Sequence, residues 1–361
     1  LAIGAPGEDI GSTQNAGMVT VAYGSESSGL GSPQAFHQGQ ASVIGSAEEG
    51  DAFGNSLTVG DFNADGYDDL VIGVPSEDIG SIRSAGAVNL FYGTADKLSR
   101  VYQQFFSQNT AGVKGTSEEY DYFGLSLATG DISGDGYDDL VIGVPSEDIG
   151  STVAAGMVQV LKGSFHGIHV EDDLEYHQNR PGFPGTAEHG DFFGWSLATG
   201  DIGSDGVDDL VVGVAFEDVG DVVQAGLVQI IHSTGSIQEL TQNTPGVAGV
   251  AEQYDRFGTN VMVVDYTNSG GDDLIVSAPG EAIGSIEFVG AVHTLRSSGG
   301  VITAVGDKVY HPGSSRLGGA ATMVSFFGRN LTYLESSGFV YSSDQNAELM
   351  NYGGSSWYFN P

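Results

Sequence analysis

The stretch Asp61–Leu70 has the sequence DFNADGYDDL. Three near-copies follow it, namely DISGDGYDDL at Asp131–Leu140, DIGSDGVDDL at Asp201–Leu210 and DYTNSGGDDL at Asp265–Leu274. The copies begin at residues 61, 131, 201 and 265, so successive starts are 70, 70 and 64 residues apart. Self-similarity at a nearly fixed interval marks repeated structural units, so these stretches predict a tandem-repeat protein.

The residues around each copy predict four β-strands per repeat. In the repeat that starts at residue 123, the candidate strands are 124–130, Leu140–Val144, Gly156–Leu161 and Leu174–Gln178, each bounded by Gly, Asp or Ser. Such runs are typical of antiparallel strands, and no stretch has a helical period of useful length. A four-stranded unit in tandem is typical of propeller blades, whose faces are buried by their neighbours. We therefore predict an all-β fold, a β-propeller of four-stranded antiparallel blades.

We expect residues 1–361 to form a single β-propeller domain. Leu1–Pro6 matches Leu70–Pro75, so we expect the chain to begin inside a repeat and to form an incomplete ring. Near the other end the acidic loop is lost, because Ser325 to Asn330 contains no Asp. The expected units are a partial blade at 1–38, full blades at about 53–108, 123–178, 193–242 and 257–312, and a degenerate last blade at about 317–361.

Composition excludes several classes of protein. The 361 residues include 47 Asp plus Glu, 11 Lys plus Arg and no cysteine, for a formal net charge of −36. Nucleic-acid binding is not expected, because phosphate recognition needs clustered Lys and Arg. The absence of cysteine excludes disulfides and thiolate metal sites. Membrane insertion is not expected either, since no apolar run approaches the ~18 residues of a membrane-spanning helix.

The acidic loops have the residue types of a calcium site. Oxygen-bearing side chains at loop positions 1, 3, 5 and 9, with Gly at position 6, suit a hard cation such as Ca²⁺. The carboxylates of one loop repel one another unless a cation neutralises them. The alternative is that these loops are Asx turns that only join strands.

Two further features complete a resemblance to a known family. Phe-Gly opens each repeat at residues 53, 123, 193 and 257, and Gly-Val-Pro follows the first two loops at 73–75 and 143–145. Together with the acidic loop, these motifs resemble the FG-GAP repeat of integrin α-subunit propellers and of secreted bacterial proteins. The resemblance implies seven blades in the complete protein.

The same resemblance implies a ligand set in each loop. Positions 1, 3, 5 and 9 would supply side-chain oxygens, and position 7 would supply its backbone carbonyl. We expect about three strong Ca²⁺ sites, with the fourth in doubt because only two of its ligand positions carry carboxylates. In the third loop, Gly203 at position 3 offers no side chain. The candidate ligands are Asp61, Asn63, Asp65, Tyr67 and Asp69; Asp131, Ser133, Asp135, Tyr137 and Asp139; Asp201, Asp205, Val207 and Asp209; and Asp265, Thr267, Ser269, Gly271 and Asp273.

The sequence favours a binding module over an enzyme. It contains no G-x-S-x-G, no Walker A loop and no Gly-rich dinucleotide turn. We therefore expect a secreted or cell-surface calcium-binding propeller that acts in adhesion, as a scaffold or in protein interaction, with an extracellular protein or polysaccharide as partner. The alternative left open is a carbohydrate-active enzyme or lectin with its site in the propeller funnel.

Overall fold

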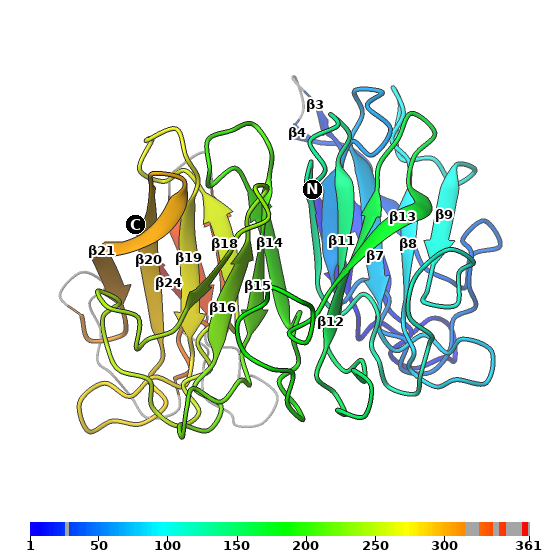
Figure 1. The fold of residues 1–361 in the computed structure, drawn as a ribbon. Helices are drawn as coiled ribbons and strands as arrows, with labels where there is room; N and C mark the ends of the chain where they lie inside the picture. The colour runs from blue at the N-terminus through cyan, green and yellow to red at the C-terminus, as the bar shows by residue number, and fades with distance from the viewer. Residues whose placement is uncertain (26–28, 315–324, 335–338, 344–355, 360–361) are drawn as a thin grey trace. The chain divides into compact units, whose positions relative to one another are not determined.

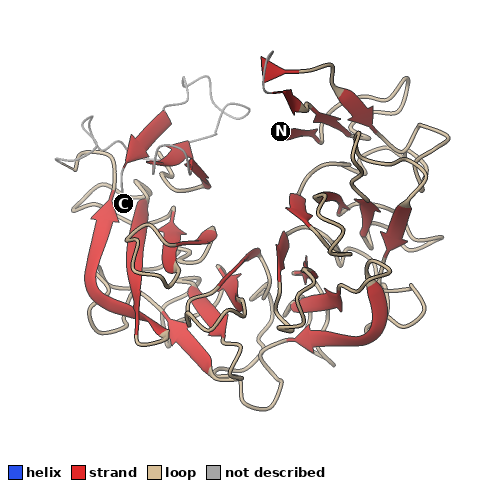
Figure 2. Ribbon diagram, turned by 90° about the horizontal axis from the view of Figure 1, so that it is seen from above, coloured by secondary structure: helices blue, strands red, loops and turns tan. Residues whose placement is uncertain are grey.

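A computed structural model describes residues 1–25, 29–314, 325–334, 339–343 and 356–359. Within these ranges the chain consists of strands and loops and contains no helix, as Figure 2 shows. The described part of the chain accordingly has no helix that could cross a membrane. The chain divides into two compact units, Leu1–His177 and Gln178–Pro361.

The first unit contains two complete four-stranded antiparallel sheets, a three-stranded sheet and a short hairpin (Figure 1). Strand order follows chain order in the complete sheets, so each strand pairs with the next along the chain. The three-stranded sheet is β1 (Ala2–Ala5), β2 (Met18–Val21) and β5 (Gln34–Phe36), and the hairpin is β3 (Gly24–Ser25) with β4 (Gly29–Leu30). The complete sheets are β6 (Leu57–Gly60), β7 (Asp69–Val74), β8 (Ala87–Phe91) and β9 (Gln103–Phe106), then β10 (Leu127–Gly130), β11 (Asp139–Val144), β12 (Met157–Lys162) and β13 (His169–Tyr176).

The second unit repeats this plan. It also has two complete antiparallel sheets, followed by a three-stranded one. The complete sheets are β14 (Ser196–Gly200), β15 (Asp209–Val214), β16 (Leu227–Ile231) and β17 (Ile237–Leu240), then β18 (Val261–Val264), β19 (Asp273–Ala278), β20 (Ala291–Ser298) and β21 (Val301–Tyr310). The last sheet is β22 (Asn330–Leu334), β23 (Phe339–Ser343) and β24 (Ser356–Phe359). Residues 315–324, 335–338, 344–355 and 360–361 of the predicted last blade lie outside the described residues.

The apolar run after each acidic loop forms the second strand of a sheet and the centre of the core. All six residues of β7 and of β11 are buried. One apolar cluster in the first unit joins Val71 of β7 to Leu140 of β11, and a cluster in the second unit joins Val211 of β15 to Leu274 of β19. Neighbouring complete sheets within each unit therefore pack face to face, which explains why a run this apolar can occupy a strand.

Within each unit, a Phe-Gly pair attaches its sheet to the preceding one. Phe123 is fully buried, and its backbone pairs with Gly86, which precedes β8. Gly86 has a φ of 85°, and a Cβ there would lie 2.4 Å from the backbone nitrogen of Phe123. Glycine is needed at position 86 because both the left-handed φ and the close approach exclude a side chain. Equivalent close contacts join Gly17 to Phe53, Gly226 to Phe257 and Gly290 to Phe327.

Candidate metal centres

Each acidic loop connects the first strand of a complete sheet to the second. The loop that begins at Asp61 leaves β6 after Gly60 and enters β7 at Asp69. The other three loops occupy the same place between β10 and β11, between β14 and β15, and between β18 and β19. The fold therefore gathers the predicted ligands of each site into a single tight connection.

The first residue of every loop organises the turn. In the first loop, the Asp61 carboxylate accepts hydrogen bonds from the backbone N–H of Asp65 at 3.0 Å and of Gly66 at 2.8 Å. Gly66 has a φ of 86°, a left-handed conformation that glycine adopts without strain. The same two bonds are made by Asp131, Asp201 and Asp265 in the other three loops, at 2.8 to 2.9 Å. All four loops consequently share one hydrogen-bonding pattern.

Positions 3 and 5 add to this pattern in the first loop. Asn63 Oδ1 accepts a hydrogen bond from the backbone N–H of Asp65 at 2.9 Å, and Asp65 Oδ1 accepts one from Tyr67 at 3.0 Å. These are Asx-type bonds, in which a side chain stabilises the turn two residues further on. Asx turns, the alternative given for these loops, thus describe the hydrogen bonds within the first loop. These hydrogen bonds leave further lone pairs on the same side-chain oxygens, which a cation could use.

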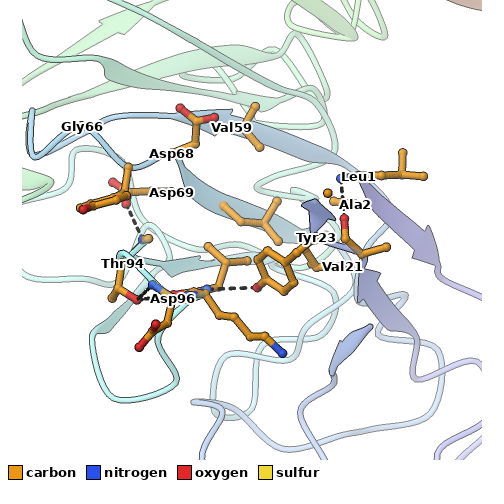
Figure 3. Close-up of a pocket in the computed structure, with 17 residues that line it drawn as sticks. Leu1, Ala2, Val21, Tyr23, Val59, Gly66, Asp68, Asp69, Thr94 and Asp96 are labelled. Atoms are coloured by element: carbon orange, nitrogen blue, oxygen red, sulfur yellow. Dashed lines mark hydrogen bonds between the residues drawn. The ribbon is translucent and has the colours of Figure 1, made fainter. Parts of the chain in front are cut away.

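The last Asp of each loop is fully buried and anchors the loop to the sheet. Asp69 accepts a hydrogen bond from Gly93 N–H at 2.7 Å through one oxygen (Figure 3) and from Phe62 N–H at 3.2 Å through the other. Asp139 does the same with Gly163 and Ser133. Burial raises the pKa of Asp69 to about 7 against the effect of these donors, and the nearby charges of Asp65 and Asp61 raise it further. A bound cation would relieve that repulsion.

The donor chemistry of the first two loops fits a hard cation. Every predicted ligand atom is an oxygen, from a carboxylate, an amide, a hydroxyl or a backbone carbonyl, as Ca²⁺ prefers. The described ranges contain no group of three or more His, Cys, Asp or Glu side chains in a metal-holding arrangement. The structure therefore brings the predicted ligands into one turn without closing a carboxylate cage around a point, and their assignment as ligands stays a prediction.

The fourth loop, whose calcium site is the doubtful one, differs from the others in its internal hydrogen bonds. The Gly271 carbonyl, its predicted position-7 ligand, already accepts hydrogen bonds from the hydroxyls of Ser297 at 2.9 Å and Ser269 at 3.3 Å. Thr267, at position 3, donates its hydroxyl to Asp273 at 2.8 Å. Predicted ligand oxygens of the fourth loop thus already accept hydrogen bonds from internal hydroxyl groups.

Position 8, which is not a predicted ligand, links neighbouring sheets in the second and fourth loops. Asp138 Oδ2 accepts a hydrogen bond from the backbone N–H of Asp61 at 2.8 Å, and Asp272 Oδ2 accepts one from Asp201 at 2.9 Å. Asp68, at the same position in the first loop, is exposed and lines a pocket of about 440 Å³ together with Leu1 and Tyr23 (Figure 3). Each of these bonds fixes the start of one loop to the next loop along the chain.

A second repeated contact was not predicted. Buried Gln38 donates its side-chain amide to buried Glu77 at 2.7 Å. The same bond joins residues 39 apart in three further places, at Gln108–Glu147, Gln178–Glu217 and Gln242–Glu281. Burial raises the pKa of Glu77 to about 8, and the charges of Asp51, Glu48 and Asp78 add to the effect. The recurrence of Gln and Glu at this spacing was the sequence signal.

Comparison with known protein families identifies three of these repeats. The FG-GAP repeat matches residues 53–91, 123–161 and 193–231, so the chain carries at least three FG-GAP repeats. The loop that begins at Asp265 lies outside these matches. Together with the four-stranded antiparallel sheets, the matches confirm the predicted FG-GAP-type β-propeller fold, while the number of blades stays a prediction.

Comparison with individual proteins points to the integrin α subunits. The chain is 31% identical over 251 residues to integrin alpha-5 of Xenopus laevis, an alignment that covers 67% of this chain and 21% of that protein. It is 33% identical over 175 residues to integrin alpha pat-2 of Caenorhabditis elegans, covering 45% of this chain and 13% of that one. The chain thus spans about a fifth or less of these relatives. A solved structure, that of the Dos1 propeller, aligns with 90% of this chain and 64% of its own at 12% identity and a TM-score of 0.43.

Proposed function

We propose that this chain is a secreted or cell-surface calcium-binding β-propeller that binds an extracellular protein, in adhesion or as a scaffold. The observation that carries the proposal is the set of four acidic loops, in which the first Asp accepts the same backbone N–H hydrogen bonds and every candidate ligand atom is an oxygen. The similarity to integrin α subunits supports an interaction role. The integrin α likeness also supports an extracellular location.

In the first site, Asp61, Asn63, Asp65 and Asp69 with the Tyr67 carbonyl would hold the ion. Bound Ca²⁺ supplies positive charge that offsets the repulsion among the carboxylates. The chain itself supplies the turn, because Asp61 orders the backbone at Asp65 and Gly66. The equivalent residues of the second and third loops complete about three strong sites, with the fourth in doubt.

We further propose that the sheets are blades of one propeller domain, with seven blades in the complete protein. The support is the face-to-face packing of neighbouring sheets within each unit, and the Phe-Gly contacts that recur between them. The number seven rests on the family resemblance. Electron microscopy of the full-length protein tests it, since a ring of any other number of blades would contradict it.

The interaction role is tested by binding to immobilised extracellular-matrix proteins and to a panel of polysaccharides, each with Ca²⁺ and with excess chelator. We expect saturable binding to a protein that weakens in chelator. Because the net charge is −36, we expect the partner surface to be cationic and binding to weaken with salt, as charges beyond ~10 Å are screened at 0.1 M. Polysaccharide cleavage, seen as new reducing ends, would overturn this proposal in favour of the enzymatic alternative, and polysaccharide binding without cleavage would favour a lectin.

A further inference from the structure

A pocket of about 420 Å³ in the second unit has a lining unlike the rest of this chain. Its ten lining residues include two arginines and five aromatic side chains, but no carboxylate. The whole chain has 47 acidic residues and only 11 Lys plus Arg. Two guanidinium groups at one pocket without an acidic neighbour in its lining are therefore a strong local departure from the overall charge.

The aromatic part of the wall is built around Phe216. The ring centroids of Phe216 and Trp195 are 4.9 Å apart in an edge-to-face arrangement, and the guanidinium of Arg256 lies 4.7 Å from the centre of the Phe216 ring. On another part of the wall, Phe288 and Phe326 have centroids 5.7 Å apart. Packing of aromatic rings on each other and beneath a guanidinium limits their rotation, which makes a preformed apolar surface.

Arg256 carries a buried hydrogen-bond donor that lacks a partner in the described part of the chain. One terminal nitrogen of Arg256 donates to Gln224 Oε1 at 3.3 Å, but its buried Nε has no hydrogen-bond partner in the described part of the chain. Burial lowers the pKa of Arg256, and the positive charge of Arg329 lowers it further. A buried donor without a partner is costly, and an anion placed beside both guanidinium groups would satisfy it.

The repeats show that the fold does not require this lining. Phe216 stands where two other repeats have Ser76 and Ser146, and Phe288 stands where they have Ser84 and Ala154. Phe288 also has a φ of 54°, in the left-handed region that disfavours a bulky side chain. Gln224 holds the position of Phe288 in the third repeat, so the other sheets form without an aromatic group at either position, and a role in binding explains the two phenylalanines better than a role in folding.

We propose that this pocket binds a partner peptide in which an apolar side chain lies next to a carboxylate. The apolar side chain fills the aromatic pocket, and the carboxylate pairs with Arg256 and Arg329. A saccharide fits less well, since Tyr254 and Thr259 are the main uncharged polar side chains of the lining and many sugar hydroxyls would be left unpaired. This inference rests on the proposed interaction function and names the chemistry of one contact.

The probe is acetyl-glutamyl-phenylalanine amide, titrated against the whole chain while the intrinsic tryptophan fluorescence, to which Trp195 of the pocket wall and Trp357 contribute, is followed. Its neutral counterpart, acetyl-glutaminyl-phenylalanine amide, and glucuronic acid are titrated in parallel. We expect the acidic peptide to bind at least tenfold more tightly than the neutral one, because charge-assisted hydrogen bonds are at stake. Glucuronic acid should bind more weakly than the acidic peptide, and equal or tighter binding would overturn the peptide assignment.

Variants locate the contact. Arg329→Gln removes an exposed charge from the pocket rim. It should weaken binding of the acidic peptide about tenfold and leave binding of the neutral peptide unchanged. Arg83→Gln removes an exposed arginine in the first unit and serves as the matched control, with no expected change. Phe288→Ala should weaken the binding of both peptides, because it removes part of the aromatic wall. Equal affinity for the two peptides, or equal effects of the two arginine variants, would overturn the inference. Repeating the titration in chelator keeps the outcomes separate, because loss of calcium binding alone would refute the metal sites and leave this pocket intact.

Discussion

The carboxylate of Asp138 accepts a hydrogen bond from the backbone N–H of Asp61 at 2.8 Å, although the two residues are 77 positions apart. Asp138 lies in the second acidic loop and Asp61 opens the first. The bond therefore joins two candidate metal loops in series and fixes the backbone from which the Asp61 carboxylate projects. Asp272 and Asp201 repeat the arrangement in the second unit at 2.9 Å.

This bond should contribute measurably to stability even without metal. We expect Asp138→Ala to lower the free energy of unfolding by about 1–2 kcal/mol, because it leaves a backbone N–H without its charged acceptor. Asp68→Ala is the matched control, since Asp68 holds the same loop position but is exposed, and it should change stability by less than about 0.5 kcal/mol. Urea denaturation in excess chelator measures both. Equal losses would show that the bond between the loops contributes nothing.

The contact between the Phe-Gly pair and the preceding sheet makes a second prediction. Gly86→Ala should destabilise the protein by at least about 2 kcal/mol more than Gly80→Ala. Both glycines have a left-handed φ, but only a Cβ at position 86 would collide with backbone, 2.4 Å from Phe123. Position 80 has no atom within 4 Å, so it reports the cost of the backbone conformation alone, about 1–2 kcal/mol. Thermal unfolding curves of the two variants that coincide would contradict the close approach.

The buried Gln–Glu pairs predict a pH dependence. Burial raises the pKa of Glu77 in the folded state to about 8, above the usual value of 4.5 that applies when the chain is unfolded. Between these pH values the folded protein holds a proton on Glu77 that the unfolded chain releases. The contribution of Glu77 to the free energy of unfolding is therefore fully present below pH 4.5 and is lost as pH rises through 8. Glu77→Gln should therefore be near neutral at pH 5 and stabilising by on the order of 1–2 kcal/mol at pH 8. Exposed Glu49→Gln is the control. A Glu77→Gln effect that is the same at both pH values would disprove the buried protonation.

Much of the fold followed from the sequence, for a local reason. The acidic loop, the apolar run after it and the Phe-Gly pair each act within a few residues, and their repetition four times removed ambiguity about the strands. The anchoring role of Asp69 was not predicted, because its partner Gly93 lies 24 residues away on another strand end. The pairing of Gln38 with Glu77 was missed for the same reason, since its 39-residue spacing has meaning only once neighbouring sheets are packed.

The candidate sites were predicted in part. The oxygen-bearing positions of the loop were visible in the sequence, and they do lie in one turn. The hydrogen bonds within the loop were not visible in the sequence, because the backbone geometry decides which Asp61 oxygen accepts from Asp65 and which from Gly66. The aromatic pocket at Phe216 was also missed. Arg256 and Arg329 lie more than 70 residues apart in the sequence, and no local pattern marks two arginines that meet only through folding.

Calcium removal should lower thermal stability. At a free Ca²⁺ concentration ten times the dissociation constant, each site adds about 1.4 kcal/mol by mass action. Three such sites would add roughly 4 kcal/mol, so we expect excess chelator to lower the melting temperature by several degrees. Calorimetric scans with Ca²⁺ and with chelator measure the difference, and Mg²⁺ at the same ionic strength controls for general screening. Identical melting curves in Ca²⁺ and chelator would argue against stabilising metal sites.

The number of calcium ions bound per chain tests the central claim most directly. Equilibrium dialysis should show about three ions bound, with dissociation constants near 10⁻⁴–10⁻³ M, the range typical of extracellular calcium-binding modules. Asp65→Ala should reduce the count by one, because it removes a carboxylate from the first loop. Ser269→Ala, at the same position of the fourth loop, should leave the count unchanged. Absence of saturable binding, or an unchanged count in Asp65→Ala, would contradict the account and leave the acidic loops as Asx turns that only join strands.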